Sequence, residues 1–259
     1  MMNLHVYSHY SGKDYSSPTK QLLQEYQCGK FILSITDHNC VKANAVAQTL
    51  AKEYGFIYIS GIEIDCTYEN RNISVIGYGI DANSRDFAEV DEKTDGIEYY
   101  ASLERLCETQ TMGFHITEYD MWNIAKNQYH PGNWTGKMFA EILFSKPEYY
   151  HHPLLQKYRI SSESRTNYYE AFSHDFYSEG ALCYVKIDYM HVSEAINIIH
   201  QNGGKAVLGL SGFNKITNDD IKKLFNYKID FIDFYGNYFM EREKNELSDC
   251  LSRYIMQNI

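Results

Sequence analysis

The sequence predicts an α/β fold in which strands and helices alternate, interrupted by a helical insertion. Strand and helix signals alternate over residues 1–83 and again over residues 181–259. Between residues 84 and 180 strand signals are absent, and apolar residues recur at helical spacing. Short connections between alternating elements are typical of a parallel sheet or barrel. We therefore expect residues 1–83 and 181–259 to form one domain and residues 84–180 to form its insertion.

The first part contains four strand signals and two helix signals. Ser17 and Pro18 are typical of a helix start, because serine caps a helix and proline suits its first position. Glycines follow both apolar helical patterns and predict where the helices end. The expected elements are a strand over Asn3–Tyr7, a helix from Ser17 to Gly29, a strand over Phe31–Ile35, a helix from Val46 to Tyr54, and strands over Phe56–Ile64 and Ile73–Tyr78.

The insertion and the last part follow the same logic. Apolar residues three and four positions apart predict helices around Leu103–Cys107, Met121–Ala125 and Phe139–Leu143. The expected elements of the last part are a helix over His191–Asn202, a strand over Ala206–Leu208, a helix over Asn218–Phe225, a strand over Ile229–Tyr235 and a helix over Arg242–Gln257.

Composition limits the classes of partner. The 259 residues include 24 basic and 34 acidic side chains and carry a net charge of −10. This balance argues against nucleic-acid and anionic-membrane partners, because both require a basic surface. Six scattered cysteines without a CxxC pair favour reduced thiols. With no membrane-spanning or leader pattern, we expect a cytoplasmic protein; a protein partner stays undetermined.

Polar residues cluster where the first strands end. His5 and Tyr7 end the first, Asp37 and His38 follow the second, and the third carries Glu63 and Asp65. In parallel α/β folds such ends converge, and imidazole with carboxylate binds Zn²⁺, Mn²⁺ or Fe. The alternative is a set of solvated polar residues. Asp37 has two interpretations, a carboxylate that orients His38 or the cap of the next helix.

The order of these segments resembles a known family. NLHVYSHYSG, ITDHNC, GIEI and VIGYGID, followed by GFHITEYDMWNIA, EAFSHDFYSEGALCYV, SEAINIIHQNGGKAVLGLSG and KIDFIDFYGN, are similar to motifs of the PHP (polymerase and histidinol phosphatase) superfamily, in its small phosphoesterase branch. The resemblance covers nearly the whole chain. It implies a distorted seven-stranded, TIM-like β/α barrel with a helical insertion. It also implies two or three metal ions at the barrel mouth and the hydrolysis of nucleotide or other phosphate monoesters.

The resemblance implies metal ligands residue by residue. His5, His38 and Glu63 stand at ligand positions, with His38 and Glu63 as the central residues of catalysis. Four other ligand positions are changed, and they now hold Tyr7, Gly12, Ser74 and Leu210. The last pair of ligands, an aspartate and a histidine, would lie just beyond Ile259.

The insertion carries the family's phosphate-binding segment in altered form. The counterpart here is Gly136-Lys137-Met138-Phe139, in which Lys137 keeps a positive charge for substrate phosphate and Phe139 replaces a histidine. Lysine lacks the bidentate geometry of arginine, so the expected phosphate contact is weaker.

These matches and losses leave three hypotheses. The first is a PHP phosphoesterase-like protein whose degenerate metal site makes it weakly active or inactive. The second is an active phosphoesterase with a reduced site that recruits His9 or Asp14. The third is a module that binds a small molecule or a protein. A divalent metal and a small phosphorylated molecule are the expected ligands, although the metal could be absent. The roles of Asp233 and Asn237 stay open.

Overall fold

The structure is a computed structural model that describes residues 2–12, 18–24, 26, 31–161, 168–210 and 217–234. Several sequence expectations lie outside these residues: Ser17, Gly29, Asp14, Asn237 and the helix over 242–257. The side chains of Leu210 and Asp233 also lie outside the described part. In the described part no helix has both the length and the apolar composition needed to cross a bilayer.

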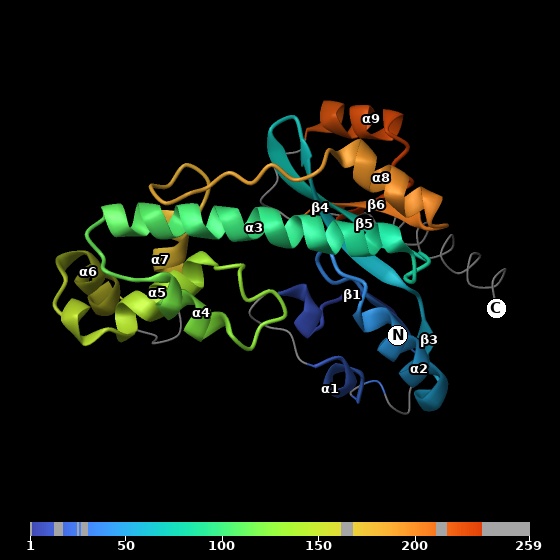
Figure 1. Cartoon of the computed structure of the whole chain (residues 1–259). Helices are drawn as coiled ribbons and strands as arrows, with labels where there is room; N and C mark the ends of the chain where they lie inside the picture. The colour runs from blue at the N-terminus through green and yellow to red at the C-terminus, as the bar shows by residue number, and fades with distance from the viewer. Residues whose placement is uncertain are drawn as a thin grey trace. The chain divides into compact units, whose positions relative to one another are not determined.

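The chain divides into two compact units. Unit 1 comprises residues 1–8, 17–88 and 189–259, and unit 2 comprises residues 9–16 and 89–188. Figure 1 labels most of the helices and strands from which the two units are built. The proposed domain limits at residues 83 and 180 stay a prediction.

The described strands all belong to unit 1 and form two sheets. The first sheet has the order β1-β2-β3 and is parallel. The second has the order β4-β5-β6-β7. The strands are Met2–Val6 (β1), Ile32–Ile35 (β2), Ile57–Tyr58 (β3), Gly61–Tyr68 (β4), Arg71–Tyr78 (β5), Lys205–Leu210 (β6) and Phe231–Phe234 (β7).

The α/β class is confirmed, whereas a closed barrel is not observed among the described strands. The expectation of purely parallel strands is wrong for the second sheet, in which β5 is antiparallel to both β4 and β6. The reason is the connection between β4 and β5. Glu69 and Asn70 both have positive φ, 44° and 65°, and this geometry lets a two-residue turn fold a hairpin back on itself.

The expected strand over Phe56–Ile64 is divided into β3 and β4. The break comes at Ser60 and Gly61, where the backbone passes close to Ser34; a Cβ at position 61 would collide with the Ser34 hydroxyl. This close approach requires glycine. It moves the chain from the first sheet to the second.

Helices cover the strands of unit 1. Its helices are Thr19–Gln24 (α1), Ala43–Tyr54 (α2), Val192–Gln201 (α8) and Asn218–Asn226 (α9). Helix α8 packs on β4, β5 and β6, and α2 packs on β2 and β3. Alternation along β4 gives the sheet two different faces. Ile62, Ile64 and Cys66 are fully buried on one face, whereas Glu63 and Asp65 share the other.

Helices form the described part of unit 2, which contains no strand. Helix α3 begins in unit 1 at Arg85 and continues through Thr111. Helix α5 packs on α4 and α7 around buried aromatic residues that include Trp134 and Phe139. The other elements are His9–Ser11 (η1), Glu118–Ala125 (α4), Gly136–Ser145 (α5), Pro147–Tyr149 (η2), Pro153–Ser161 (α6) and Tyr168–Tyr177 (α7).

Candidate metal centre

The three sequence-predicted ligands lie together in unit 1. His5 belongs to β1, His38 follows β2, and Glu63 belongs to β4. Glu63 Oε2 lies 3.0 Å from His5 Nε2 and 3.6 Å from His38 Nε2. An isolated parallel β-bridge pairs the backbones of His38 and Glu63. Backbone hydrogen bonds on both sides of the bridge, at 2.7 and 3.0 Å, hold the backbones of these two residues side by side.

Tyr7 lies in the middle of this group. Its hydroxyl donates to Glu63 Oε2 at 2.6 Å and contacts His5 Nε2, and its ring stacks on His38 with centroids 5.1 Å apart. Burial and the charge of Glu63 raise the pKa of the Tyr7 phenol, so the hydroxyl keeps its proton at neutral pH. The resemblance implies an imidazole ligand at position 7, whereas the side chain there is a neutral phenol.

The environment keeps His5 uncharged. Burial, followed by the neighbouring His38, lowers the pKa of His5 to about 4. A neutral imidazole is the form that binds a metal, since a protonated ring has no lone pair to donate. His5 therefore has the protonation state of a ligand at neutral pH.

Asp65, which the sequence analysis grouped with Glu63 on the third strand, also belongs to this site. It lies two residues after Glu63 on the same face of β4, and both of its carboxylate oxygens lie 3.0 Å from His38 Nδ1. Ser74 donates to Asp65 Oδ1 at 3.1 Å, and Asn39 donates to Oδ2 at 2.8 Å. The sequence placed Asp65 and Glu63 on one face of a strand, whereas the hydrogen bonds of Asp65 to His38 and Ser74 are seen only in the structure.

Asp37 interacts with the segment that follows β1 and does not cap a helix. It accepts hydrogen bonds from the Ser8 amide and hydroxyl, both at 2.6 Å, whereas the N-cap position of α2 is Lys42. The capping interpretation is therefore wrong. Burial raises the pKa of Asp37 to about 6, and the Ser8 hydrogen bonds limit this increase.

The donor set fits one divalent cation. His38, Glu63 and Asp65 each offer an atom within 4.8 Å of the others, but Asp65 is hydrogen-bonded to His38 Nδ1. His5, which lies beside Glu63, therefore completes the ligand set with Glu63 and His38 Nε2. Ligands about 2.1 Å from a tetrahedral ion lie roughly 3.4 Å from one another. The distances of 3.0 and 3.6 Å from Glu63 Oε2 to the two imidazoles bracket that value. Imidazole and carboxylate together suit Zn²⁺, Mn²⁺ or Fe.

Other sequence-predicted residues belong to unit 2. Lys137 is in the first turn of α5, and Phe139 is a fully buried core residue whose ring stacks on Tyr177 with centroids 5.1 Å apart. His130 lies between two carboxylates of α3. Its two ring nitrogens lie 2.9 Å from Asp91 and from Asp95.

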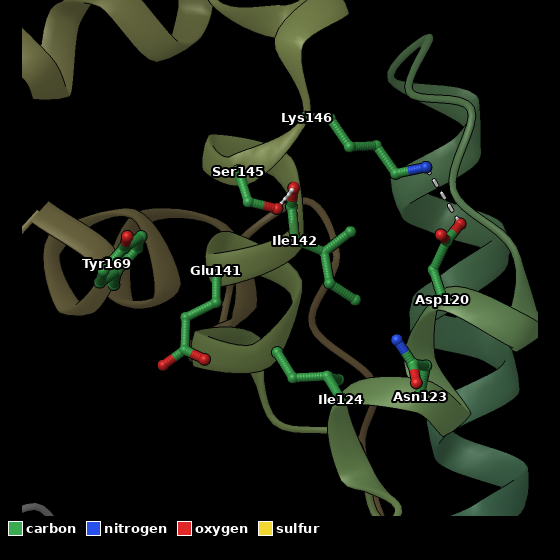
Figure 2. A pocket seen from close by; sticks show the side chains of 8 residues that line it. All are labelled: Asp120, Asn123, Ile124, Glu141, Ile142, Ser145, Lys146 and Tyr169. Atoms are coloured by element: carbon green, nitrogen blue, oxygen red, sulfur yellow. Dashed lines mark hydrogen bonds and ion pairs between the residues drawn. The ribbon is translucent and has the colours of Figure 1, made fainter.

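Unit 2 also contains a pocket, which none of the predicted site residues lines. Figure 2 shows this pocket of about 570 Å³, which lies among α4, α5 and α7. Lys146 pairs with Asp120 at 3.2 Å across it, and Tyr169 forms part of its wall. Its polar groups include none of the histidines or cysteines that would make it a transition-metal site.

The fold of this chain is similar to the folds of two solved proteins. The fold matches an amidohydrolase from Chromobacterium violaceum, solved with bound sulfate and no metal, with a TM-score of 0.65 and 16% identity over 89% of this chain and 75% of the other. It also matches a protein described as a metal-dependent phosphoesterase from Bifidobacterium adolescentis, with a TM-score of 0.65 and 15% identity over 97% of this chain and 83% of the other. At 15–16% identity, these two likenesses show that the chain shares the fold of these proteins, as the resemblance predicts.

Two curated proteins are similar to this chain in sequence. One is a 5'-3' exoribonuclease of Haemophilus influenzae, 23% identical over 90% of this chain and 74% of the relative. The other is the 5'-3' exoribonuclease Rnm of Salmonella typhimurium, 25% identical over 79% of this chain. The aligned part spans 62% of the length of Rnm. No protein-family model matches the chain.

Proposed function

We propose that this chain is a PHP-type phosphoesterase whose centre is reduced to one cation site, formed by His5, His38 and Glu63, and that its hydrolysis of phosphate esters is slow or absent. The observation that carries this proposal is the position of Tyr7. Its hydroxyl hydrogen-bonds to Glu63 and contacts His5, so it takes up the ligand atoms that a cation would need. Ser74, at another changed ligand position, hydrogen-bonds to Asp65 instead.

His5, His38 and Glu63 would be the cation's ligands. His5 and His38 would hold the cation through Nε2, and Glu63 would hold it through a carboxylate oxygen. A bound cation would supply hydroxide near neutral pH by lowering the pKa of its water, and would offset charge on phosphoryl oxygens. Tyr7 must give up its hydrogen bond to Glu63 before that oxygen is available. This competition is the physical reason for expecting weak binding and slow turnover.

The substrate class needs a test that includes RNA. Two relatives are named as 5'-3' exoribonucleases, which conflicts with the expectation that nucleic acid is not a partner. The net charge of −10 still argues against a broad basic surface for RNA. We therefore propose phosphate esters as the substrate class, including both short single-stranded RNA and small monoesters. Lys137 remains the proposed phosphate contact.

Metal content tests the centre directly. After expression with added manganese, zinc and iron, elemental mass spectrometry should find about one cation per chain. The cation should be lost in His38→Ala and in Glu63→Gln, which keeps the shape of the side chain and removes its charge. Two or more cations per chain would contradict the reduced centre. A metal-free wild-type protein would contradict the cation site itself.

Activity is measured on the same preparations. A short RNA labelled at its 3′ end and p-nitrophenyl phosphate cover the two substrate types. Any hydrolysis that belongs to this centre should disappear in Glu63→Gln and weaken in Lys137→Ala. Rapid turnover by the wild type would show that the centre is not impaired.

A further inference from the structure

We propose that Asp65 is a positioning residue that fixes which nitrogen of His38 carries the proton, leaving Nε2 bare and directed at Glu63. The inference rests on the proposed function only in taking Nε2 as the cation-binding atom. It concerns an interaction that is complete without any metal. The sequence analysis placed Asp65 among the polar residues that could gather at a metal site, and neither it nor the resemblance links Asp65 to His38.

The His38 ring lies between two carboxylates, Asp65 and Glu63. Nδ1 lies 3.0 Å from both oxygens of Asp65, and Nε2 lies 3.6 Å from Glu63 Oε2. Asp65 lies within hydrogen-bond distance of Nδ1, whereas the Glu63 oxygen lies just beyond that distance from Nε2. Two lone pairs facing each other at 3.0 Å would repel, so Nδ1 must carry a hydrogen that Asp65 accepts. In a neutral ring the hydrogen on Nδ1 leaves Nε2 with its lone pair.

Asp65 is itself held in place by hydrogen bonds from neighbouring side chains. The Asn39 side chain makes two hydrogen bonds to it. The side-chain NH2 donates to Asp65 Oδ2 at 2.8 Å, and the side-chain oxygen accepts from the Asp65 backbone amide at 2.9 Å. Asn39 adopts positive φ, 54°, which asparagine tolerates better than most residues. The Ser74 hydroxyl donates to Oδ1 at 3.1 Å. With His38 and Asp65 only 7% and 16% exposed, few water molecules compete for these bonds.

Ser74 has a role in this arrangement, because its hydroxyl supports Asp65. The resemblance implies a metal-binding histidine there, and the serine found instead supports the carboxylate that orients His38. A carboxylate that accepts the second N–H of a ligand histidine fixes its tautomer and raises its basicity, and its loss typically weakens metal binding 10–100-fold. The chain has therefore lost a ligand at position 74 but keeps a hydrogen bond that supports one of the remaining ligands.

The tautomer of His38 tests this in the metal-free protein. Nitrogen chemical shifts of ¹⁵N-histidine-labelled protein, recorded near pH 8 and assigned by comparison with His38→Gln, distinguish bare from protonated ring nitrogens. We expect Nδ1–H with a bare Nε2 in the wild type. Asp65→Ala should lose this preference, Asp65→Asn should retain part of it through its carbonyl oxygen, and Ser74→Ala should retain nearly all of it. A wild-type ring protonated at Nε2 would overturn the proposal.

Titration with Zn²⁺ provides the second measurement on the same four proteins. Asp65→Ala should weaken binding about 10–100-fold, with partial recovery in Asp65→Asn. Circular dichroism identifies any variant that has not folded, and Asp65→Asn then carries the test because it keeps the side chain's size. If the wild type shows the expected tautomer but binds no zinc, the role of Asp65 is supported and the proposed cation site fails. Unchanged tautomer and unchanged zinc affinity in both Asp65 variants would overturn the inference.

Discussion

At the scale of the residue, one hydroxyl group determines the character of the centre. The Tyr7 hydroxyl donates to Glu63 at 2.6 Å and contacts His5, which keeps two predicted ligands in a hydrogen-bonded group. Its neighbours stabilise the neutral form, because burial and the charge of Glu63 both raise the pKa of the phenol. A cation must compete with this group, so the choice of side chain at position 7 should control metal affinity.

Tyr7→His should therefore increase the affinity for Zn²⁺ and Mn²⁺, by at least about tenfold, because it exchanges a competing hydroxyl for an imidazole ligand. Calorimetric titration measures the dissociation constants. Tyr7→Phe is the matched control, since it removes the hydroxyl and adds no ligand. Its stability should fall by roughly 1–3 kcal/mol, the usual result of leaving buried polar partners without a hydrogen bond. Equal cation affinity in Tyr7→His and the wild type would show that residue 7 does not limit binding.

At the scale of the element, helix α9 is attached to the β4–β5 hairpin by two ion pairs among the described residues, Asp220 with Arg71 and Lys223 with Glu69 at 2.9 Å. Asp220 pairs with Arg71 at 3.0 Å and also accepts from the amide and hydroxyl of Thr217, each at 2.8 Å, which completes the capping box of α9. The Arg71 hydrogen bond, followed by those from Thr217, lowers the pKa of Asp220. Asp219, next to it, is 82% exposed and pairs only with Lys222 among the contacts seen.

Asp220→Ala should lower the free energy of unfolding by roughly 1–3 kcal/mol at neutral pH, whereas Asp219→Ala should change it by no more than about 0.5 kcal/mol. Urea unfolding measures both. The pKa of Asp220 is lower in the folded state, so its contribution is present above the unfolded pKa of about 3.9 and is lost as the pH falls through the folded value. The difference between Asp220→Ala and the wild type should therefore shrink in acid. A difference that is constant down to the lowest pH would contradict the ion pair.

At the scale of the whole molecule, the two units can be followed separately. The candidate centre lies in unit 1, whereas both tryptophans, Trp122 and Trp134, lie in unit 2. Trp134 is fully buried in the aromatic core, so its fluorescence reports the unfolding of that unit. Far-ultraviolet circular dichroism reports the helices and strands of both units.

Added Mn²⁺ should raise the thermal midpoint seen by circular dichroism and move the tryptophan midpoint less. A ligand that binds only the folded state stabilises it by about 2.7 kcal/mol at about 100 times its dissociation constant. Manganese is preferred to zinc here, because the free cysteines, such as Cys66 and Cys107, would bind zinc more strongly in the unfolded chain. Glu63→Gln should abolish the shift. Equal shifts by both probes would show that the units unfold together, and a shift that persists in Glu63→Gln would place the cation elsewhere.

The sequence by itself determined the α/β class, the helical character of the residues after 84, and the meeting of His5, His38 and Glu63. These follow from local patterns, because hydrophobic periodicity reports helices and strands, and polar residues at strand ends report where a site lies. The tertiary structure decided that β4 and β5 form an antiparallel hairpin, that the Tyr7 hydroxyl contacts both His5 and Glu63, and that Asp65 supports His38. These features depend on strand direction and on contacts between residues 27 or 56 positions apart, as with His38–Asp65 and Tyr7–Glu63. Periodicity carries no information about such distant pairs, because strand pairing and side-chain packing are settled only when the whole chain folds.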